Sequence, residues 1–255
     1  MGLTWIVQTN LVSERTQWIE SLDALGSKYA KIEIIPFEHD VPHVEVEGPA
    51  IVYGSTTLIK CAPKHKNWNP GLFFDPSNFR PSKWSEKWGE EMLNHDGKVV
   101  KVKDVLDVMG YDCFMRPNDD LKDFSGSRVN REYMEVFVKD VVDGQFPFSP
   151  DLEVHISSMK PIYQEYRVFI VDGKPVAWSQ YRYRSMLLKS REVPQSVIDY
   201  AQDMANIWSP EKAFVMDVCV NEDQKLKILE LNCFNASGVY LCNIPDIIKA
   251  VERMF

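Results

Sequence analysis

The chain has 255 residues, 45% of them hydrophobic and 26% charged, a composition typical of a globular protein with room for one large or two to three small domains. The net charge of −8 argues against a general nucleic-acid binder and a binder of anionic membranes, because both need a cationic surface. No run approaches the length of an apolar membrane span, and the opening residues lack the basic and apolar regions of a secretion signal, so no membrane association is expected.

The first third of the chain alternates strand-like and helix-like segments. Ser13 is a suitable cap for a helix that ends at Gly26. Strand-like runs precede and follow this helix, at residues 4–8, 32–36 and 50–53. This alternation predicts a small parallel α/β layer, and we expect it to form an N-terminal domain over residues 1–110.

From about Tyr111 the pattern changes to paired strands. Asp172-Gly173 is a strong hairpin turn between two long strands, and Asn130 is a suitable helix cap. Strands are predicted at residues 112–116, 153–157, 162–171, 174–183, 213–221 and 225–232. Residues 111–255 are therefore expected to form an α+β domain with antiparallel sheets.

A cation and a small-residue loop occur close together after the strand at 112–116. Arg116 ends this strand, and Lys122 and Ser125-Gly126-Ser127 follow it. Glycine permits close approach of the backbone, while serine hydroxyls and backbone N–H groups can surround anionic oxygens. Neither a P-loop nor a G-x-G-x-x-G motif is present. The segment suggests another kind of phosphate site, although an arginine on an ordinary turn explains it equally well.

Charged residues also interrupt the apolar strand at 162–171. Glu165 and Arg167 point to the same side, so this face carries an internal ion pair or meets a charged ligand. Positive character continues past the hairpin, where a solvated edge is the simpler explanation, at Arg182, Arg184, Lys189 and Arg191.

The hairpin at 213–232 carries two carboxylates and an amide. Glu230 and Asn232 share one face of their strand, and a turn at Asp223-Gln224 places Asp217 opposite Glu230. Adjacent carboxylates repel unless a cation lies between them, and carboxylate and amide oxygens are ligands that Mg²⁺ accepts together with substrate phosphates. A solvated hairpin face is the alternative, but the rest of both strands is apolar.

The five cysteines are scattered with no C-x-x-C pair, which favours free buried thiols and a cytoplasmic location over zinc or disulfides. The five histidines form no credible Ser-His-Asp or Cys-His arrangement.

The order of these features resembles the ATP-grasp superfamily. The resemblance extends from about Tyr111 to Phe255 and rests on Arg116-Pro117 with its Gly/Ser loop, the segment 165–173, Met216-Asp217-Val218, and Glu230-Leu231-Asn232 followed by Ser237-Gly238. The family usually has Lys where this chain has Arg116, so the chain looks like the small bacterial and phage subgroup with that replacement. Arginine keeps the charge and can contact phosphate through two donors.

The resemblance implies a role for each residue. Arg116 and the loop of Lys122, Ser125, Gly126 and Ser127 would contact the ATP phosphates, and Ile156–Lys160 would form the hinge between two lobes and line the adenine. Glu165 would hold the ribose, and Arg167 would be the catalytic residue that faces the transferring phosphoryl group. Asp217, Glu230 and Asn232 would bind Mg²⁺, with Mn²⁺ as a substitute. Asn235, Ser237 and Gly238 would lie beside the acceptor.

The implied activity is ligation of a carboxylate to an amine through an acyl phosphate, with release of ADP and phosphate. The expected partners are ATP and a small carboxylate, amine or peptide substrate. A kinase with a hydroxyl acceptor and a degenerate ATP-binding or scaffold protein are the alternatives. The motifs leave the donor, the acceptor and the oligomeric state open.

Overall fold

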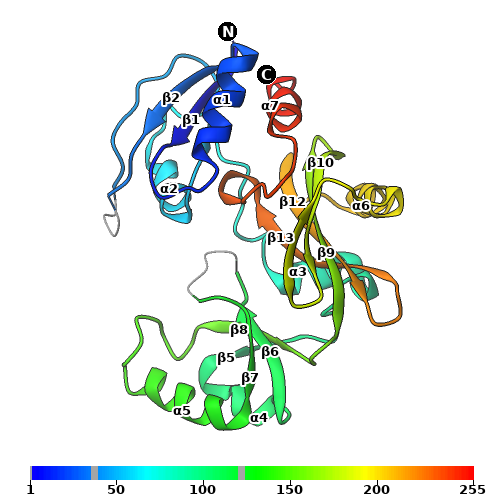
Figure 1. Ribbon diagram of the computed structural model, residues 1–255. Helices are drawn as coiled ribbons and strands as arrows, with labels where there is room; N and C mark the ends of the chain where they lie inside the picture. The colour runs from blue at the N-terminus through cyan, green and yellow to red at the C-terminus, as the bar shows by residue number, and fades with distance from the viewer. Residues whose placement is uncertain (1, 36–39, 120–123) are drawn as a thin grey trace.

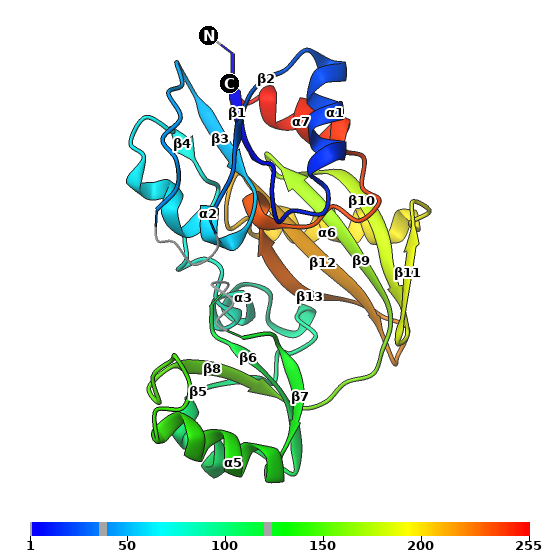
Figure 2. The same ribbon diagram turned by 60° about the vertical axis from the view of Figure 1, so that its left-hand side comes forward.

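The computed structural model describes residues 2–35, 40–119 and 124–255. Three sheets build the molecule (Figure 1). The N-terminal sheet and the large central sheet lie together, and the third sheet with its helix α5 projects as a separate layer (Figure 2). Within the described residues no helix is long and apolar enough to cross a membrane.

The N-terminal sheet A has the order β2-β1-β3-β4, and all of its strand pairs are parallel. Its strands are β1 (Thr4–Gln8), β2 (Lys28–Ile32), β3 (Ala50–Tyr53) and β4 (Pro70–Gly71). Helix α1 (Arg15–Leu25) connects β1 to β2, and α2 (Thr56–Cys61) follows β3. The predicted parallel α/β layer is confirmed.

Two predicted details of this layer are wrong. Glu14, not Ser13, precedes the first turn of α1, and no side chain caps that helix. The second strand covers Lys28–Ile32 instead of residues 32–36. Gly26 adopts the left-handed conformation at the helix end, with φ of 66°, so the chain turns back at once and the strand begins two residues later.

The central sheet B has the order β11-β10-β9-β12-β13 and is antiparallel throughout. Its strands are β9 (Ile162–Val171), β10 (Lys174–Tyr183), β11 (Met186–Ser190), β12 (Ala213–Asn221) and β13 (Leu226–Cys233). Helices α6 (Gln195–Ile207) and α7 (Ile244–Glu252) pack against it. Asp172 and Gly173 both have positive φ, as the predicted tight hairpin requires.

Sheet C has the order β5-β8-β6-β7 and is also antiparallel. Its strands are β5 (Lys98–Lys101), β6 (Asp112–Pro117), β7 (Ser127–Asn130) and β8 (Glu153–Ser157). Helices α4 (Val105–Val108) and α5 (Arg131–Val142) accompany it, and Asn130 caps α5 by accepting from the Tyr133 N–H at 2.8 Å. A domain boundary at residue 110 would separate β5 from this sheet.

Short elements complete the chain between the sheets. Helix α3 (Pro81–Trp88) covers part of sheet B, and four single 3₁₀ turns are η1 (Ala62–Lys64), η2 (Gly89–Glu91), η3 (Val102–Asp104) and η4 (Phe234–Ala236). Residues 158–161 connect β8 of sheet C to β9 of sheet B. At this connection Asp96 accepts hydrogen bonds from Ser158 and forms an ion pair with Lys160.

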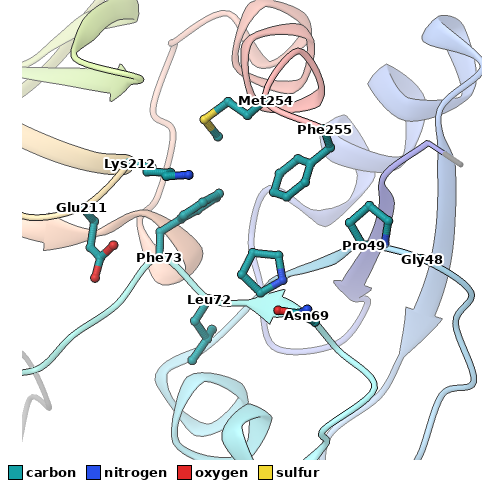
Figure 3. A pocket seen from close by; sticks show the side chains of 10 residues that line it. Gly48, Pro49, Asn69, Leu72, Phe73, Glu211, Lys212, Met254 and Phe255 are labelled. Carbon is teal, nitrogen blue, oxygen red and sulfur yellow. The ribbon is translucent and has the colours of Figure 1, made fainter.

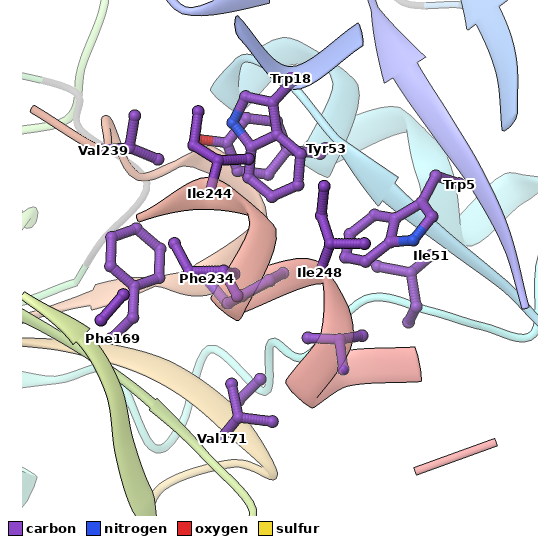
Figure 4. Close-up of a cluster of buried hydrophobic side chains, with 14 of the residues drawn as sticks. Trp5, Trp18, Ile51, Tyr53, Phe169, Val171, Phe234, Val239, Ile244 and Ile248 are labelled. Atoms are coloured by element: carbon purple, nitrogen blue, oxygen red, sulfur yellow. The ribbon is translucent and has the colours of Figure 1, made fainter. Parts of the chain in front are cut away.

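One aromatic core joins the N-terminal sheet to the central sheet. Trp5 and Trp18 pack at 5.4 Å between ring centroids, and Phe234 stands edge-on to Phe73 and Phe169 (Figure 4). Ile247 and Ile248 of α7 are fully buried in the same cluster. Because this core contains residues of both sheets, the loop at Phe234 is held against the N-terminal layer.

Candidate active site

The β12–β13 hairpin brings the predicted metal-binding side chains together. Asp217 pairs with Glu230, and Asn232 follows two residues later on the same face, so the predicted register is confirmed. The Asn232 amide nitrogen donates to Asp217 Oδ2 and to Glu230 Oε1, both at 3.2 Å. The three side chains form one polar group in a largely apolar hairpin.

Arg167 lies on β9, directly beside Asp217. Its Nε and Nη2 donate to the two Asp217 oxygens at 2.9 and 2.7 Å, and its Nη1 donates to the Gly238 carbonyl at 2.8 Å. Arg167 is 7% exposed and Asp217 is 1% exposed, so this bidentate pair compensates both charges inside the protein. Arg167 therefore links the carboxylate pair to the loop after β13.

The electrostatics of this corner are those of two crowded carboxyl groups. Burial outweighs the opposing effect of Arg167 and raises the pKa of Asp217 to about 6, and the neighbouring Glu230 carboxylate adds to the rise. A cation placed near the pair would relieve this repulsion.

Arg116 reaches the same corner from sheet C. Its Nη1 donates to Glu230 Oε2 at 2.9 Å, and its guanidinium lies 5.1 Å from the centre of the Trp84 ring. A cavity of about 290 Å³ opens beside this ion pair, and its lining includes Arg116, Ser125, Gly126, Glu230 and Asn232. These five predicted site residues therefore share one cavity between two sheets.

The glycine–serine loop closes tightly over Arg116. A Cβ atom at Gly126 would lie 2.7 Å from Phe114 Cζ and 3.2 Å from Arg116 Cβ, so the close approach depends on glycine. Ser125 lines the cavity, whereas Ser127 is exposed and pairs with Met115 at the start of β7. Lys122 lies outside the described residues.

Glu165 lies two residues before Arg167 on the same face of β9. Burial raises its pKa, while a hydrogen bond from Tyr181 and the charge of Arg182 lower it. The Arg182 Nε lies 3.4 Å from Glu165 Oε1. This half-buried carboxylate therefore has a polar setting beside the corner.

The hinge residues are placed differently from the expectation. Ile156 belongs to the apolar core under sheet C, on the opposite face of β8 from His155, so its packing does not support contact with adenine. Lys160 is engaged with Asp96. His155, which pairs with Arg116 across β8 and β6, shares the face that looks away from that core.

The loop predicted to hold the acceptor is used mainly to fasten the N-terminal sheet. Asn235 donates to the Val52 carbonyl at 2.7 Å and accepts from the Phe73 N–H at 2.9 Å. The Ser237 hydroxyl donates to the Cys233 carbonyl at 2.6 Å. Both side chains are buried and satisfied, so these contacts do not support an acceptor role for them, and Gly238 is the member of the set that lies at the corner.

Sequence reasoning missed two tyrosines that enclose Arg167. The rings of Tyr181 and Tyr240 stack at 4.6 Å, and the Arg167 guanidinium lies 4.8 Å from the centre of Tyr240 and 5.7 Å from that of Tyr181. Tyr181 was within reach, because it alternates onto the face of its strand that pairs with Glu165 and Arg167. Tyr240 lies in a loop with no periodic signal.

The donor set fits Mg²⁺ in chemistry, with two carboxylates and an amide at one corner and a raised carboxyl pKa that a cation would relieve. Arg116 and Arg167 already bond to the carboxylates. Within the described residues no group of three His, Cys, Asp or Glu side chains is arranged to hold a metal ion.

A second cavity, of about 760 Å³, lies between β4 and the end of α7 (Figure 3). Its walls are mainly apolar, with Phe73, Met254 and Phe255 around the opening, and Glu211 and Lys212 supply its charges. None of the predicted site residues lines it.

A family model of the ATP-grasp domain, that of clade family 3, matches residues 37–251, and the chain belongs to this family. The resemblance read from the sequence is confirmed. No curated protein matches this sequence.

Solved structures share the fold at low sequence identity. The ATP-grasp ligase PsnB complexed with a minimal precursor is 10% identical with a TM-score of 0.58, and 98% of each chain is covered. The D-cycloserine synthetase DcsG is 12% identical with a TM-score of 0.62, and 99% of each chain is covered. N5-carboxyaminoimidazole synthetase from Staphylococcus aureus, complexed with ADP, is 12% identical with a TM-score of 0.63 over 98% of this chain and 77% of that chain. The predicted ATP-grasp fold is confirmed.

Proposed function

We propose that this protein is an ATP-dependent ligase that joins a carboxylate to an amine through an acyl phosphate and releases ADP and phosphate. The observation that carries the proposal is the corner itself, where Arg116 of one sheet and Arg167 of another each pair with one member of a carboxylate couple. The family membership and the likeness to structures named as ligases and synthetases support it.

The cavity between sheets B and C is the proposed site of the ATP phosphates. Arg116 supplies a permanent cation, and Ser125 and Gly126 bring hydroxyl and backbone groups to the same cavity. We place the two lobes on either side of this cavity, with residues 156–160 as the hinge, and retain Lys122, Ser127 and Lys160 as proposed ATP contacts. Glu165 is proposed to hold the ribose.

Asp217, Glu230 and Asn232 are the proposed ligands of Mg²⁺, or of Mn²⁺ in its place. When bound, the ion would neutralise charge on the phosphate oxygens. PsnB has been solved with Mg and ADP, which is consistent with this assignment.

The proposed chemistry needs positioning and charge stabilisation more than a protein nucleophile. A substrate carboxylate oxygen attacks the γ-phosphorus of ATP and the bond to the β–γ bridging oxygen breaks, giving ADP and an acyl phosphate. An amine nitrogen then attacks the acyl carbon, loses a proton and displaces inorganic phosphate. Arg167 is proposed to stabilise the phosphoryl group in transit, and Gly238 to lie beside the acceptor.

Measurement of Mg²⁺-dependent ATP turnover with amino acids and short peptides tests the proposal. Asp217→Asn and Glu230→Gln are each expected to abolish turnover, whereas Glu222→Gln and Asp223→Asn, on the exposed turn of the same hairpin, are matched controls. Retained turnover in both site variants would remove the proposed metal site.

Product analysis separates the alternatives. An amide with release of phosphate supports the ligase, and a stable phosphorylated product would identify a kinase on a hydroxyl acceptor. Absence of both ATP binding and turnover would favour a scaffold protein. The five cysteines are buried and free, which agrees with the cytoplasmic location included in this proposal.

A further inference from the structure

The outer edge of sheet B is unusually apolar. β11 is the edge strand, so half of its backbone N–H and C=O groups point away from β10 (Figure 2). Three consecutive side chains on it are exposed, Met186 by 60%, Leu187 by 66% and Leu188 by 47%. Proteins normally protect such an edge, because it offers a template for another strand.

The same edge is basic in an acidic protein. Residues 182–191 contain four basic side chains and no acidic one, although the whole chain has 37 acidic and 29 basic residues. Arg182 pairs with Glu165, but among the described residues Arg184, Lys189 and Arg191 form no ion pair with a carboxylate. The charge of this edge therefore complements an acidic partner.

The edge also leads to the active-site corner. The Lys189 Nζ lies 5.7 Å from the centre of the Tyr240 ring, and Arg167 lies 4.8 Å from the same ring. Beyond Tyr240, a cavity of about 420 Å³ is bounded by Arg191, Asn243 and the α1 residues Gln17 and Ser21. A chain lying along β11 reaches this cavity within a few residues.

We propose that the carboxylate substrate is an acidic polypeptide segment that adds a strand to the edge of β11 and delivers a carboxylate to the corner at Arg167 and Gly238. The inference rests on the proposed function and names its substrate class. Backbone pairing supplies affinity, the aliphatic side chains supply an apolar surface, and the basic residues select acidic sequences. A lipid surface would use the same charges and apolar groups but not the exposed backbone edge, so the edge favours a peptide.

Fluorescence anisotropy tests the proposal with a labelled peptide of alternating Glu and Val, and a Lys–Val peptide of equal length as the control. The acidic peptide should bind the wild-type protein, and Lys189→Glu with Arg191→Glu should weaken binding by at least about tenfold. The control, Lys174→Glu with Lys225→Glu, makes the same change in net charge at exposed positions in two other hairpins of sheet B, and should bind as wild type does. Peptide binding should also slow hydrogen exchange at the β11 amides.

Equal binding of the two peptides, equal loss in both double variants, or binding to phosphatidylserine vesicles in place of the peptide would overturn the proposal. A parallel melting experiment with Mg-ATP keeps the two proposals apart. A wild-type protein that is stabilised by Mg-ATP but binds no acidic peptide retains the ATP site and loses only the peptide surface.

Discussion

Arg116 and Arg167 are the two cations of the corner, but their surroundings differ. Arg167 is almost fully buried and its donors are used by Asp217 and Gly238. The Arg116 side chain is 13% exposed and lines the cavity proposed for phosphate. We therefore expect Arg116 to act in ground-state binding of ATP and Arg167 in the reaction.

Substitution of the two arginines should separate these steps. Arg116→Ala should mainly weaken ATP binding, and Arg116→Lys should recover part of it, because lysine supplies charge without the two-donor fork. Arg167→Ala should lower kcat by about 10²-fold or more, in line with other preorganised charge stabilisers, and change ATP affinity little. ATP titration and single-turnover rates measure both. Normal turnover with lost affinity in Arg167→Ala would assign that residue to binding.

His155 is a buried imidazole without a hydrogen-bond partner on either ring nitrogen. Burial, and then the charge of Arg116, lower the pKa of His155 to about 4 from 6.5. Between these pH values the unfolded chain binds the proton and the folded chain does not. The stabilisation is therefore complete above pH 6.5 and is lost as the pH falls towards 4.

The free energy of unfolding should accordingly fall by up to about 3 kcal/mol across this interval through His155. Urea titrations of wild type and His155→Leu at several pH values measure the difference between the two proteins. His43→Gln, at a half-exposed histidine, is the control. A pH dependence that is the same in wild type and His155→Leu contradicts the prediction.

At the scale of elements, the β6–β7 connection is shaped by one small residue. Gly126 approaches Phe114 and Arg116 so closely that a methyl group forces the Phe114 ring to move. The loop and the strand beneath it therefore form a single surface around the proposed phosphate site.

Gly126→Ala should weaken ATP binding by about tenfold, since overpacking of this kind typically costs about 1–3 kcal/mol. Gly110→Ala is a matched control, because no atom lies within 4 Å of a Cβ at that position. Isothermal titration with ATP and Mg²⁺ measures both variants. Equal affinities would show that the loop does not contact the nucleotide.

At the scale of the whole molecule, the proposed site depends on contacts between sheets. Arg116 and Glu230 are 114 residues apart in the chain and join sheet C to sheet B. Asn235 joins the loop after β13 to β3 over 183 residues. A ligand in the cavity would contact two sheets at once and should stabilise their arrangement.

Mg-ATP should therefore raise the melting temperature of the whole protein, because a ligand that binds only the native state stabilises it by mass action. At about 100-fold excess over Kd the gain is about 2.7 kcal/mol. Differential scanning fluorimetry with ATP, ADP and Mg²⁺ measures the shift, and Glu230→Gln should reduce it. Absence of any shift at millimolar concentrations would support the scaffold alternative.

The sequence by itself determined the local pairings of the central sheet. The turn at Asp172-Gly173 fixed the β9–β10 hairpin, and the two-residue period of strands placed Asp217, Glu230 and Asn232 on one face. These features depend on residues close together in the chain, so their pattern is legible without a tertiary structure.

Only the tertiary structure decided which groups meet across the sheets. Short, charged β5 gave too weak a strand signal to be assigned to sheet C, and Asn235 became a fastening of the N-terminal layer instead of an acceptor contact. The pairing of Arg116 with Glu230 and the stacking of Tyr240 on Tyr181 likewise join distant segments. Such contacts depend on how the sheets pack, and no local periodicity encodes that packing.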